Sequence, residues 1–199
     1  MLRNRVISTL AALAFATTIA TGCRPRGKTM DQRDAGATIY PSAASTFTSA
    51  DGHVALTATA GWFAAAKTGG GREVLRLENS RKLHLTVDSY TREDLQVKTI
   101  ESFVKFVTDP FAKDLKDATR CEPKPLEIKG RRAMQCEIFG AKDGYVFGYL
   151  ITAVETDKEW HCITGMGIKS RFTLARDELG GIAMSFRTSD ALGPSQVAP

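Results

Sequence analysis

The sequence predicts an α+β domain in which an antiparallel β-sheet of about 6–8 strands packs against one long amphipathic helix and a short C-terminal helix. Three observations predict this class. Residues 120–169 contain strand patterns divided by turn signals, which is typical of an antiparallel meander. Residues 91–109 place apolar side chains at helical spacing. Residues 170–182 repeat that spacing over a shorter stretch.

The first 22 residues predict a bacterial lipoprotein signal peptide. Arg3 and Arg5 precede an apolar run over residues 6–19, which is too short to span a bilayer because a spanning helix needs about 20 apolar residues. Small residues then lead to Cys23, where we expect a diacylglyceryl group on the thiol after cleavage. The alternative is an ordinary cleavage site, since Ala20 stands where lipoproteins prefer Leu, Val or Ile. Two or three acyl chains would hold the protein on a membrane.

Cleavage at this point would leave 177 of the 199 residues, enough for one domain with flanking segments. The mature chain would keep 25 of the 27 basic residues and all 22 acidic ones, a net charge of +3. Because this excess is small and the longest basic clusters are only 24–28 and 129–132, we expect no nucleic-acid partner. We expect residues 23–45 to form a lipidated flexible tether, residues 46–187 the folded domain, and residues 188–199 a disordered tail.

The domain should open with a β-hairpin, because a turn signal at Asp51-Gly52 precedes the alternating residues 53–59. The glycines at 69–71 lead into a strand pattern without the Lys and Ser or Thr of a phosphate-binding loop, so we interpret them as a turn. Two further strands are predicted at 74–77 and 83–87.

The long helix should begin at Thr91, a capping residue followed by acidic side chains that favour a helix N-terminus. Pro110 should end the helix near Asp109, because proline lacks the backbone N–H of a helix interior. Three aromatic side chains of this region are expected to fill the core. They are Phe103, Phe106 and Phe111.

The meander should contain four strands with tight turns at Lys129-Gly130 and around Asp143-Gly144. The strands are expected at about 121–128, 131–139, 145–155 and 160–168. Ser170 should cap the last helix. Gly180-Gly181 either ends that helix or permits close packing on the sheet, since each glycine costs about 1 kcal/mol in a helix interior.

If one of the four cysteines carries lipid, three remain in an oxidising compartment, where disulfides persist. The first turn of the meander would set position 123 opposite Cys136, so that a modest register change would join Cys121 to Cys136. Cys162 would lie two strands away, beyond the reach of a disulfide. We therefore predict a Cys121–Cys136 disulfide and a buried thiol at Cys162.

The three histidines lack the spacing of a structural zinc site. His161 and Cys162 are adjacent, so in a strand their side chains would point to opposite faces. We therefore predict no metal site and no cofactor.

Three short segments resemble the DcrB and PsbP-like superfamily. They are Ala60-Gly61-Trp62 after an early strand, the strand from Tyr145 to Val154, and the closing Ile182-Ala183-Met184-Ser185-Phe186-Arg187. Members of that group include envelope lipoproteins such as DcrB, extrinsic photosystem proteins and secretion chaperones, which share binding without a common catalytic site. The resemblance covers about residues 46–187 and implies a domain, not an enzyme, that docks a protein or peptide.

We therefore expect a lipid-anchored protein of the bacterial cell envelope that faces the periplasm. It would bind an envelope or secreted protein in a scaffold, assembly or immunity role. Arg24, not Asp, follows Cys23, which favours the outer membrane over the inner membrane under enteric sorting.

Two other function classes have their own structural requirements. A small-molecule or lipid-binding module would have an apolar cleft between the long helix and the sheet, lined by residues such as Phe103, Val107 and Tyr149. An enzyme, such as a periplasmic hydrolase, would gather at least two polar side chains in a cleft, although the sequence has no Gly-x-Ser-x-Gly elbow. The candidates for that cleft are His53, His84, His161, Asp88 and Asp143.

Overall fold

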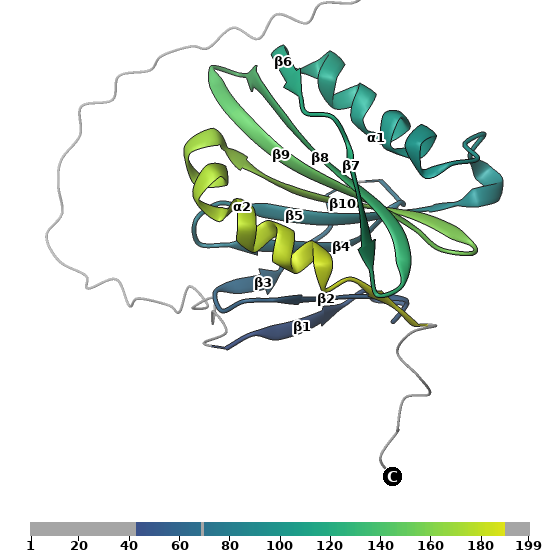
Figure 1. Cartoon of the computed structure of the whole chain (residues 1–199). Helices are drawn as coiled ribbons and strands as arrows, with labels where there is room; N and C mark the ends of the chain where they lie inside the picture. The colour runs from purple at the N-terminus through teal and green to yellow at the C-terminus, as the bar shows by residue number, and fades with distance from the viewer. Residues whose placement is uncertain (1–42, 69, 190–199) are drawn as a thin grey trace, which may run out of the picture. The chain divides into compact units, whose positions relative to one another are not determined.

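The structure, a computed structural model, describes residues 43–68 and 70–189 (Figure 1). Their strands form two antiparallel sheets, and two helices pack on opposite faces of the larger sheet. The predicted α+β class is therefore confirmed. The predicted signal peptide, the tether up to residue 42 and the tail from residue 190 lie outside the described residues. Within the described ranges, neither helix has the length and apolar character needed to span a membrane.

The smaller sheet joins the two ends of the domain. It has the order β1-β2-β11, with β1 at Ser45–Thr48, β2 at Val54–Ala58 and β11 at Arg187–Thr188. The β1–β2 pair confirms the predicted opening hairpin. Because Thr188 pairs with Val54, the ordered fold runs past the predicted boundary at residue 187.

The larger sheet contains eight strands in the order β3-β4-β5-β10-β9-β8-β6, and β7 shares the outer edge of β8 with β6. Its strands are β3 (Trp62–Ala64), β4 (Glu73–Asn79), β5 (His84–Thr91), β6 (Lys116–Arg120), β7 (Lys124–Ile128), β8 (Arg131–Lys142), β9 (Tyr145–Glu155) and β10 (Glu159–Ile168). The predicted meander corresponds to β7–β10. Its first strand begins at Lys124, not at residue 121, because β6 occupies the other half of the β8 edge.

Two tight turns fix the register of the meander. Lys129-Gly130 and Asp143-Gly144 both have positive φ angles, 51° and 78° in the first turn and 52° and 81° in the second. Two consecutive positive φ angles characterise the two-residue type I′ turn, whose twist matches that of antiparallel strands. The second turn sets Lys142 opposite Tyr145. Alternation along β9 then directs side chains to both cores, one under each helix.

Helix α1 (Ile100–Asp114) begins later than predicted. Thr91 still belongs to β5, and a single 3-10 turn (Arg92–Asp94) follows it. The cap is Thr99, whose hydroxyl accepts a hydrogen bond from the Ser102 backbone N–H at 3.3 Å. The Ser102 hydroxyl accepts one from the Thr99 N–H at 3.2 Å, which completes a capping box.

Helix α1 also continues through Pro110, where the sequence predicted its end. Pro110 is exposed, so the Phe106 carbonyl, which loses its hydrogen-bond donor, lies on the solvent side of the helix. The opposite side of α1 is buried against β6, β8 and β9. Its buried residues are Ile100, Phe103, Val104, Val107 and Thr108.

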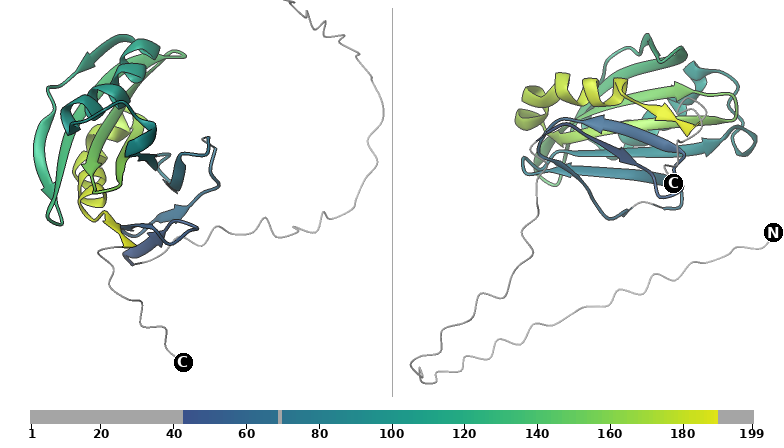
Figure 2. Two further views of the ribbon diagram at one scale, coloured as in Figure 1. Left: turned by 90° about the vertical axis from the view of Figure 1, so that its right-hand side faces the viewer. Right: turned by 90° about the horizontal axis from the view of Figure 1, so that it is seen from below.

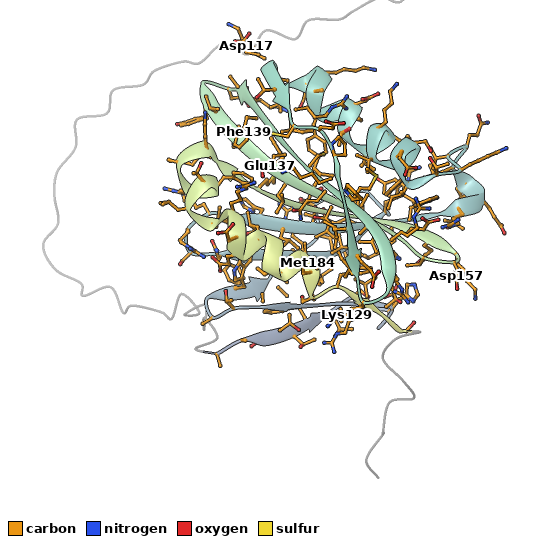
Figure 3. All side chains as sticks on the ribbon, viewed as in Figure 1. Asp117, Lys129, Glu137, Phe139, Asp157 and Met184 are labelled. Carbon is orange, nitrogen blue, oxygen red and sulfur yellow. The ribbon has the colours of Figure 1, made fainter. Side chains whose placement is uncertain are left out.

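Helix α2 (Lys169–Met184) packs on the other face of the large sheet and also contacts β2 of the small sheet (Figures 1 and 2). No side chain caps its N-terminus, so the expected cap at Ser170 is wrong. On this face of β8, Phe139, which is labelled in Figure 3, packs edge-on against Phe172 of α2, at 5.5 Å between ring centroids. A Cβ added at Gly148 would lie 2.5 Å from Phe172, so this close approach requires glycine.

Neither alternative for Gly180-Gly181 describes the structure. The helix runs past both residues to Met184, so its 16 residues exceed the 15 of α1 and it is not the short helix that the sequence predicted. A Cβ at Gly181 would meet nothing within 4 Å, and a Cβ at Gly180 would meet only Leu150, at 3.9 Å. Neither glycine is therefore required by close packing.

Glu178 connects α2 to the segment that follows β2. Its carboxylate accepts hydrogen bonds from Thr59 Oγ1 at 2.6 Å and from the buried Trp62 Nε1 at 2.8 Å, and it pairs with Arg81. Burial opposes ionisation of Glu178, but these three donors together lower its pKa. Trp62, part of the Ala60-Gly61-Trp62 segment, is thus a core residue with a satisfied indole N–H.

Candidate functional site

A hollow of about 270 Å³ lies where the edge of α1 meets β5 and β10. Helix α1 supplies Phe106, Val107, Pro110 and Phe111. The strand side supplies Arg72, Asp88, Tyr90, Cys162 and Thr164. One wall of the hollow is therefore apolar, and the facing wall carries polar and charged groups.

Aromatic side chains and one arginine form the rim of this hollow. The Tyr90 ring lies edge-on to Phe103 at 5.5 Å and to Phe106 at 5.8 Å between centroids. The Arg72 guanidinium carbon lies 5.0 Å from the Tyr90 centroid, within cation–π range. Phe106 is 39% exposed, so the expectation that it fills the core is wrong.

Three polar groups of the hollow have raised pKa values. Burial, followed by the nearby Glu73 carboxylate, raises the pKa of Asp88. Burial also raises the pKa of Tyr90 to about 12 and that of Cys162 to about 12. The phenol and the thiol therefore remain protonated at neutral pH.

The three residues predicted to line an apolar cleft do not form one together. Phe103 is fully buried and stacks on Trp160 at 5.2 Å, while Tyr149 is buried and packs against Phe111 at 5.0 Å. Of the three predicted residues only Val107 lines the hollow beside α1. The space between the helix and the sheet is filled by side chains, so the hollow lies beside α1.

The three cysteines within the described residues are free thiols, so the structure does not contain the predicted Cys121–Cys136 disulfide. Cys121 is exposed, whereas Cys136 is buried and its pKa is raised by burial to about 11. The two residues line one hollow of about 310 Å³. Cys162 is buried, as predicted. Cys23 lies outside the described residues.

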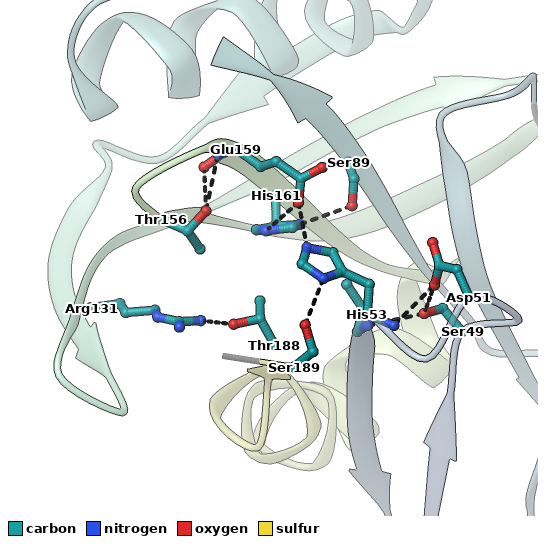
Figure 4. A network of polar contacts seen from close by, with 11 residues as sticks. Ser49, Asp51, His53, Ser89, Arg131, Thr156, Glu159, His161, Thr188 and Ser189 are labelled. Atoms are coloured by element: carbon teal, nitrogen blue, oxygen red, sulfur yellow. Dashed lines mark hydrogen bonds and ion pairs between the residues drawn. The ribbon is translucent and has the colours of Figure 1, made fainter. Parts of the chain in front are cut away.

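A second group of polar side chains lies where the small sheet meets the large one (Figure 4). His53 Nε2 is 2.7 Å from Glu159 Oε2, and His161 Nε2 is 3.5 Å from the same oxygen. The other ring nitrogens lie 2.9 Å from hydroxyls: His53 Nδ1 from Ser189 Oγ and His161 Nδ1 from Ser89 Oγ. Both imidazoles therefore direct their Nε2 atoms to one carboxylate.

Backbone structure holds each member of this group. Ser89 and His161 are directly opposite in the β5–β10 pairing. The Asp51 carboxylate accepts hydrogen bonds from the Ser49 hydroxyl and from the His53 N–H, which fixes the β1–β2 turn and lowers the Asp51 pKa.

The residues around Glu159 and His53 complete this support. The Thr156 hydroxyl donates to the Glu159 carbonyl at 2.9 Å and accepts from the Glu159 N–H at 3.1 Å. Ser189 N–H donates to the His53 carbonyl at 2.8 Å.

Two of the five residues named for an enzyme cleft, His53 and His161, converge on Glu159, so the enzyme alternative's requirement for two gathered polar side chains is met here. The other three lie elsewhere. His84 contacts Glu78 at 3.0 Å, Asp88 lines the hollow beside α1, and Asp143 is in the β8–β9 turn.

One part of the His53 group could have been found from the sequence. Glu159 and His161 are two residues apart, and both share a face once the strand begins at Glu159, one residue earlier than the predicted start at about residue 160. The adjacent His161-Cys162 pair, by contrast, has side chains on opposite faces and gave no such signal. His53 and Ser189 could not have been added, because only tertiary packing brings residues 53, 161 and 189 together.

This chain is similar to known proteins in its fold. No protein-family model matches it, and a search of curated proteins finds no match. Among solved structures it is similar to the cyanobacterial PsbP protein CyanoP from Synechocystis sp. PCC 6803, with 14% identity, a TM-score of 0.56, and coverage of 78% of this chain and 96% of CyanoP.

Two further structures are similar at 9% identity. LpqN, involved in cell envelope biogenesis of Mycobacterium tuberculosis, has a TM-score of 0.53 over 73% of this chain and 90% of LpqN. The Saccharomyces cerevisiae Ran-binding protein Mog1p has a TM-score of 0.54 over 75% of this chain and 97% of Mog1p. At such identities the likeness is one of fold, and this chain has the Mog1p/PsbP-like fold that CyanoP, LpqN and Mog1p share.

Proposed function

We propose that this chain is a lipid-anchored protein of the bacterial cell envelope that binds another envelope or secreted protein through the hollow beside α1. The lipoprotein signal pattern before Cys23 supports the anchor and a periplasm-facing position, with the outer membrane favoured. The shared fold supports the binding role, since LpqN is involved in cell envelope biogenesis and Mog1p is a Ran-binding protein.

The observation that carries the proposal is the exposed Phe106 beside Tyr90 and Arg72. Aromatic residues and arginine are enriched in protein interfaces, where a few of them supply most of the binding energy. The position of Phe106 matters as much as its type. It faces a hollow in which a partner could bury one side chain against Val107 and Phe111.

The shape of the hollow favours a protein or peptide over the small-molecule or lipid alternative. Pockets for drug-sized ligands enclose most of the ligand. The hollow beside α1 is open to solvent at the exposed Phe106, so it suits an inserted side chain of a larger partner. We propose that the partner places an apolar side chain there and contacts the rim with neighbouring residues.

The chemistry of the hollow supports binding without catalysis. Tyr90 and Cys162 have pKa values of about 12, so neither supplies an anionic nucleophile or base near pH 7. The raised pKa of Asp88 reflects mainly its burial.

The test is site-specific photocrosslinking in intact cells. A photoreactive phenylalanine analogue at position 106 should give a crosslinked protein band. The same analogue at position 174 should not, because Leu174 is 88% exposed on α2, on the other face of the large sheet. Phe106→Asp should remove co-purification of the crosslinked protein, and Leu174→Asp should retain it. Three results would overturn the proposal: equal crosslinking at both positions, crosslinks only to lipid, or undiminished co-purification of the crosslinked protein with the Phe106→Asp variant.

A further inference from the structure

We infer that His53, Glu159 and His161 form a binding site for a divalent zinc ion. This site lies outside the hollow beside α1 and does not depend on the binding role proposed for it. Two imidazoles and one carboxylate are a ligand set that zinc binds, and they leave its fourth coordination position open.

Two of the three distances between the ligand atoms are close to those of a zinc site, and the third is at most 4.8 Å. The ligand atoms all lie within 4.8 Å of one another. Zinc lies about 2.0–2.2 Å from nitrogen and oxygen ligands, so two ligand atoms of a tetrahedral site are roughly 3.3 Å apart. His161 Nε2 and Glu159 Oε2 are 3.5 Å apart, which is already close to this spacing. His53 Nε2 and Glu159 Oε2 are 2.7 Å apart and need to separate by only about 0.6 Å.

The serine hydroxyls provide the outer contacts that metal-binding histidines require. A ligating histidine normally donates its second ring N–H to a fixed acceptor, which orients the ring and sets the tautomer. Ser189 Oγ and Ser89 Oγ occupy those positions at 2.9 Å from His53 Nδ1 and His161 Nδ1. A hydroxyl both donates and accepts, so each serine can accept a hydrogen bond from Nδ1–H, which fixes the tautomer whose Nε2 lone pair binds zinc.

One ligand of the site is held rigidly in the sheet, and the other two are reached by solvent. His161 is fully buried within β10, where β5 and β9 pair with it on both sides. The His53 side chain is 35% exposed and the Glu159 side chain 24% exposed, so an ion can enter from that side. Because His53 immediately precedes β2 and the other two ligands are on β10, a bound zinc would join the small sheet to the large one.

The occupant of the fourth position would be water or a donor atom of a partner. Ser189 is not that ligand, since its hydroxyl already contacts the outer nitrogen of His53. Thiols are also excluded as ligands within the described residues, because none of the three cysteines belongs to the cluster of ligand atoms.

The experiment is zinc titration of the full-length, untagged protein in detergent after removal of metals with a chelator. Calorimetry should show one zinc ion bound per chain, and zinc should raise the melting temperature. His53→Gln should weaken zinc binding at least 100-fold and remove the melting shift. Ser89→Ala, which leaves all three ligands in place, should weaken zinc binding about 10- to 100-fold. Cobalt bound in place of zinc should give ligand-field bands without thiolate charge-transfer bands.

Two matched variants separate this site from other zinc-binding groups. His84→Gln removes a histidine that contacts Glu78 elsewhere on the large sheet, and Cys121→Ser removes the exposed thiol. Both should bind zinc as the wild type does. No bound zinc in the wild type, unchanged binding by His53→Gln, or loss of binding by Cys121→Ser would each overturn the inference. Because His53 is partly exposed, a folded His53→Gln protein is expected, and its circular dichroism spectrum verifies this.

Discussion

Gly181 offers a direct test of whether α2 is a continuous helix with an exposed face at this position. Gly181 is exposed within a continuous helix, and an added Cβ would meet nothing within 4 Å. Glycine in a helix interior is about 0.8–1.0 kcal/mol less favourable than alanine, because its backbone loses more freedom on folding. Gly181→Ala should therefore raise the free energy of unfolding by about 0.8–1.0 kcal/mol, and the melting temperature by about 2–4 °C for a domain of this size.

The measurement is thermal and urea unfolding followed by circular dichroism. Gly148→Ala is the matched control, because it makes the same chemical change where the added Cβ would lie 2.5 Å from Phe172. That variant should be destabilised, since neither the Phe172 ring nor the β9 backbone has room to move apart freely. If Gly181→Ala is neutral or destabilising while the native spectrum is retained, then α2 does not have the continuous, openly exposed geometry described above.

Three further predictions concern the anchor, an ion pair and the thiols. Cys23→Ser should abolish incorporation of labelled palmitate and release the protein from membranes; unchanged labelling would refute the anchor. The lowered pKa of Glu178 means that its contribution to stability is complete above 4.5, the ordinary pKa of a glutamate, and is lost as pH falls through the lower folded value. The free energy of unfolding, measured by urea titration, should therefore fall less steeply between about pH 6 and pH 3 in Glu178→Gln than in the wild type. Parallel pH curves for the two proteins would contradict this role of Glu178. In a Cys23→Ser background, Cys121 should react rapidly with a thiol reagent, whereas Cys136 and Cys162 should react only on unfolding; rapid reaction of all three would contradict their burial.

Local sequence signals predicted the opening hairpin, β4, β5 and the four strands of the meander, but they did not predict β3, β6 or β11. The turns at Lys129-Gly130 and Asp143-Gly144 require positive φ angles, which few residue pairs adopt readily, so they fixed the ends of three strands. Helix ends were predicted less well. Thr91 has the chemistry of a cap, but pairing between β5 and β10 holds it in a strand, and the cap is Thr99. Pro110 has the chemistry of a helix end, but its exposed position lets the helix continue.

The candidate sites were predicted only in part. The sequence suggested an apolar site at the long helix, and Val107 does line the hollow, but Phe103 and Tyr149 proved to be core residues. Whether an aromatic side chain of α1 fills the core or lies at its edge depends on how far the helix covers the sheet. No local pattern encodes that coverage.

The sequence by itself determined most of the β-strands, the two tight turns and the apolar stripe of α1, because each follows from side-chain alternation, backbone angles or helical spacing among near neighbours. It also supplied the signal pattern that predicts lipidation at Cys23. Only the tertiary structure decided that His53 meets Glu159 and His161. Glu159 and His161 lie 106 and 108 positions after His53 along the chain. The packing of the two sheets, a long-range effect, therefore sets the distance between their side chains.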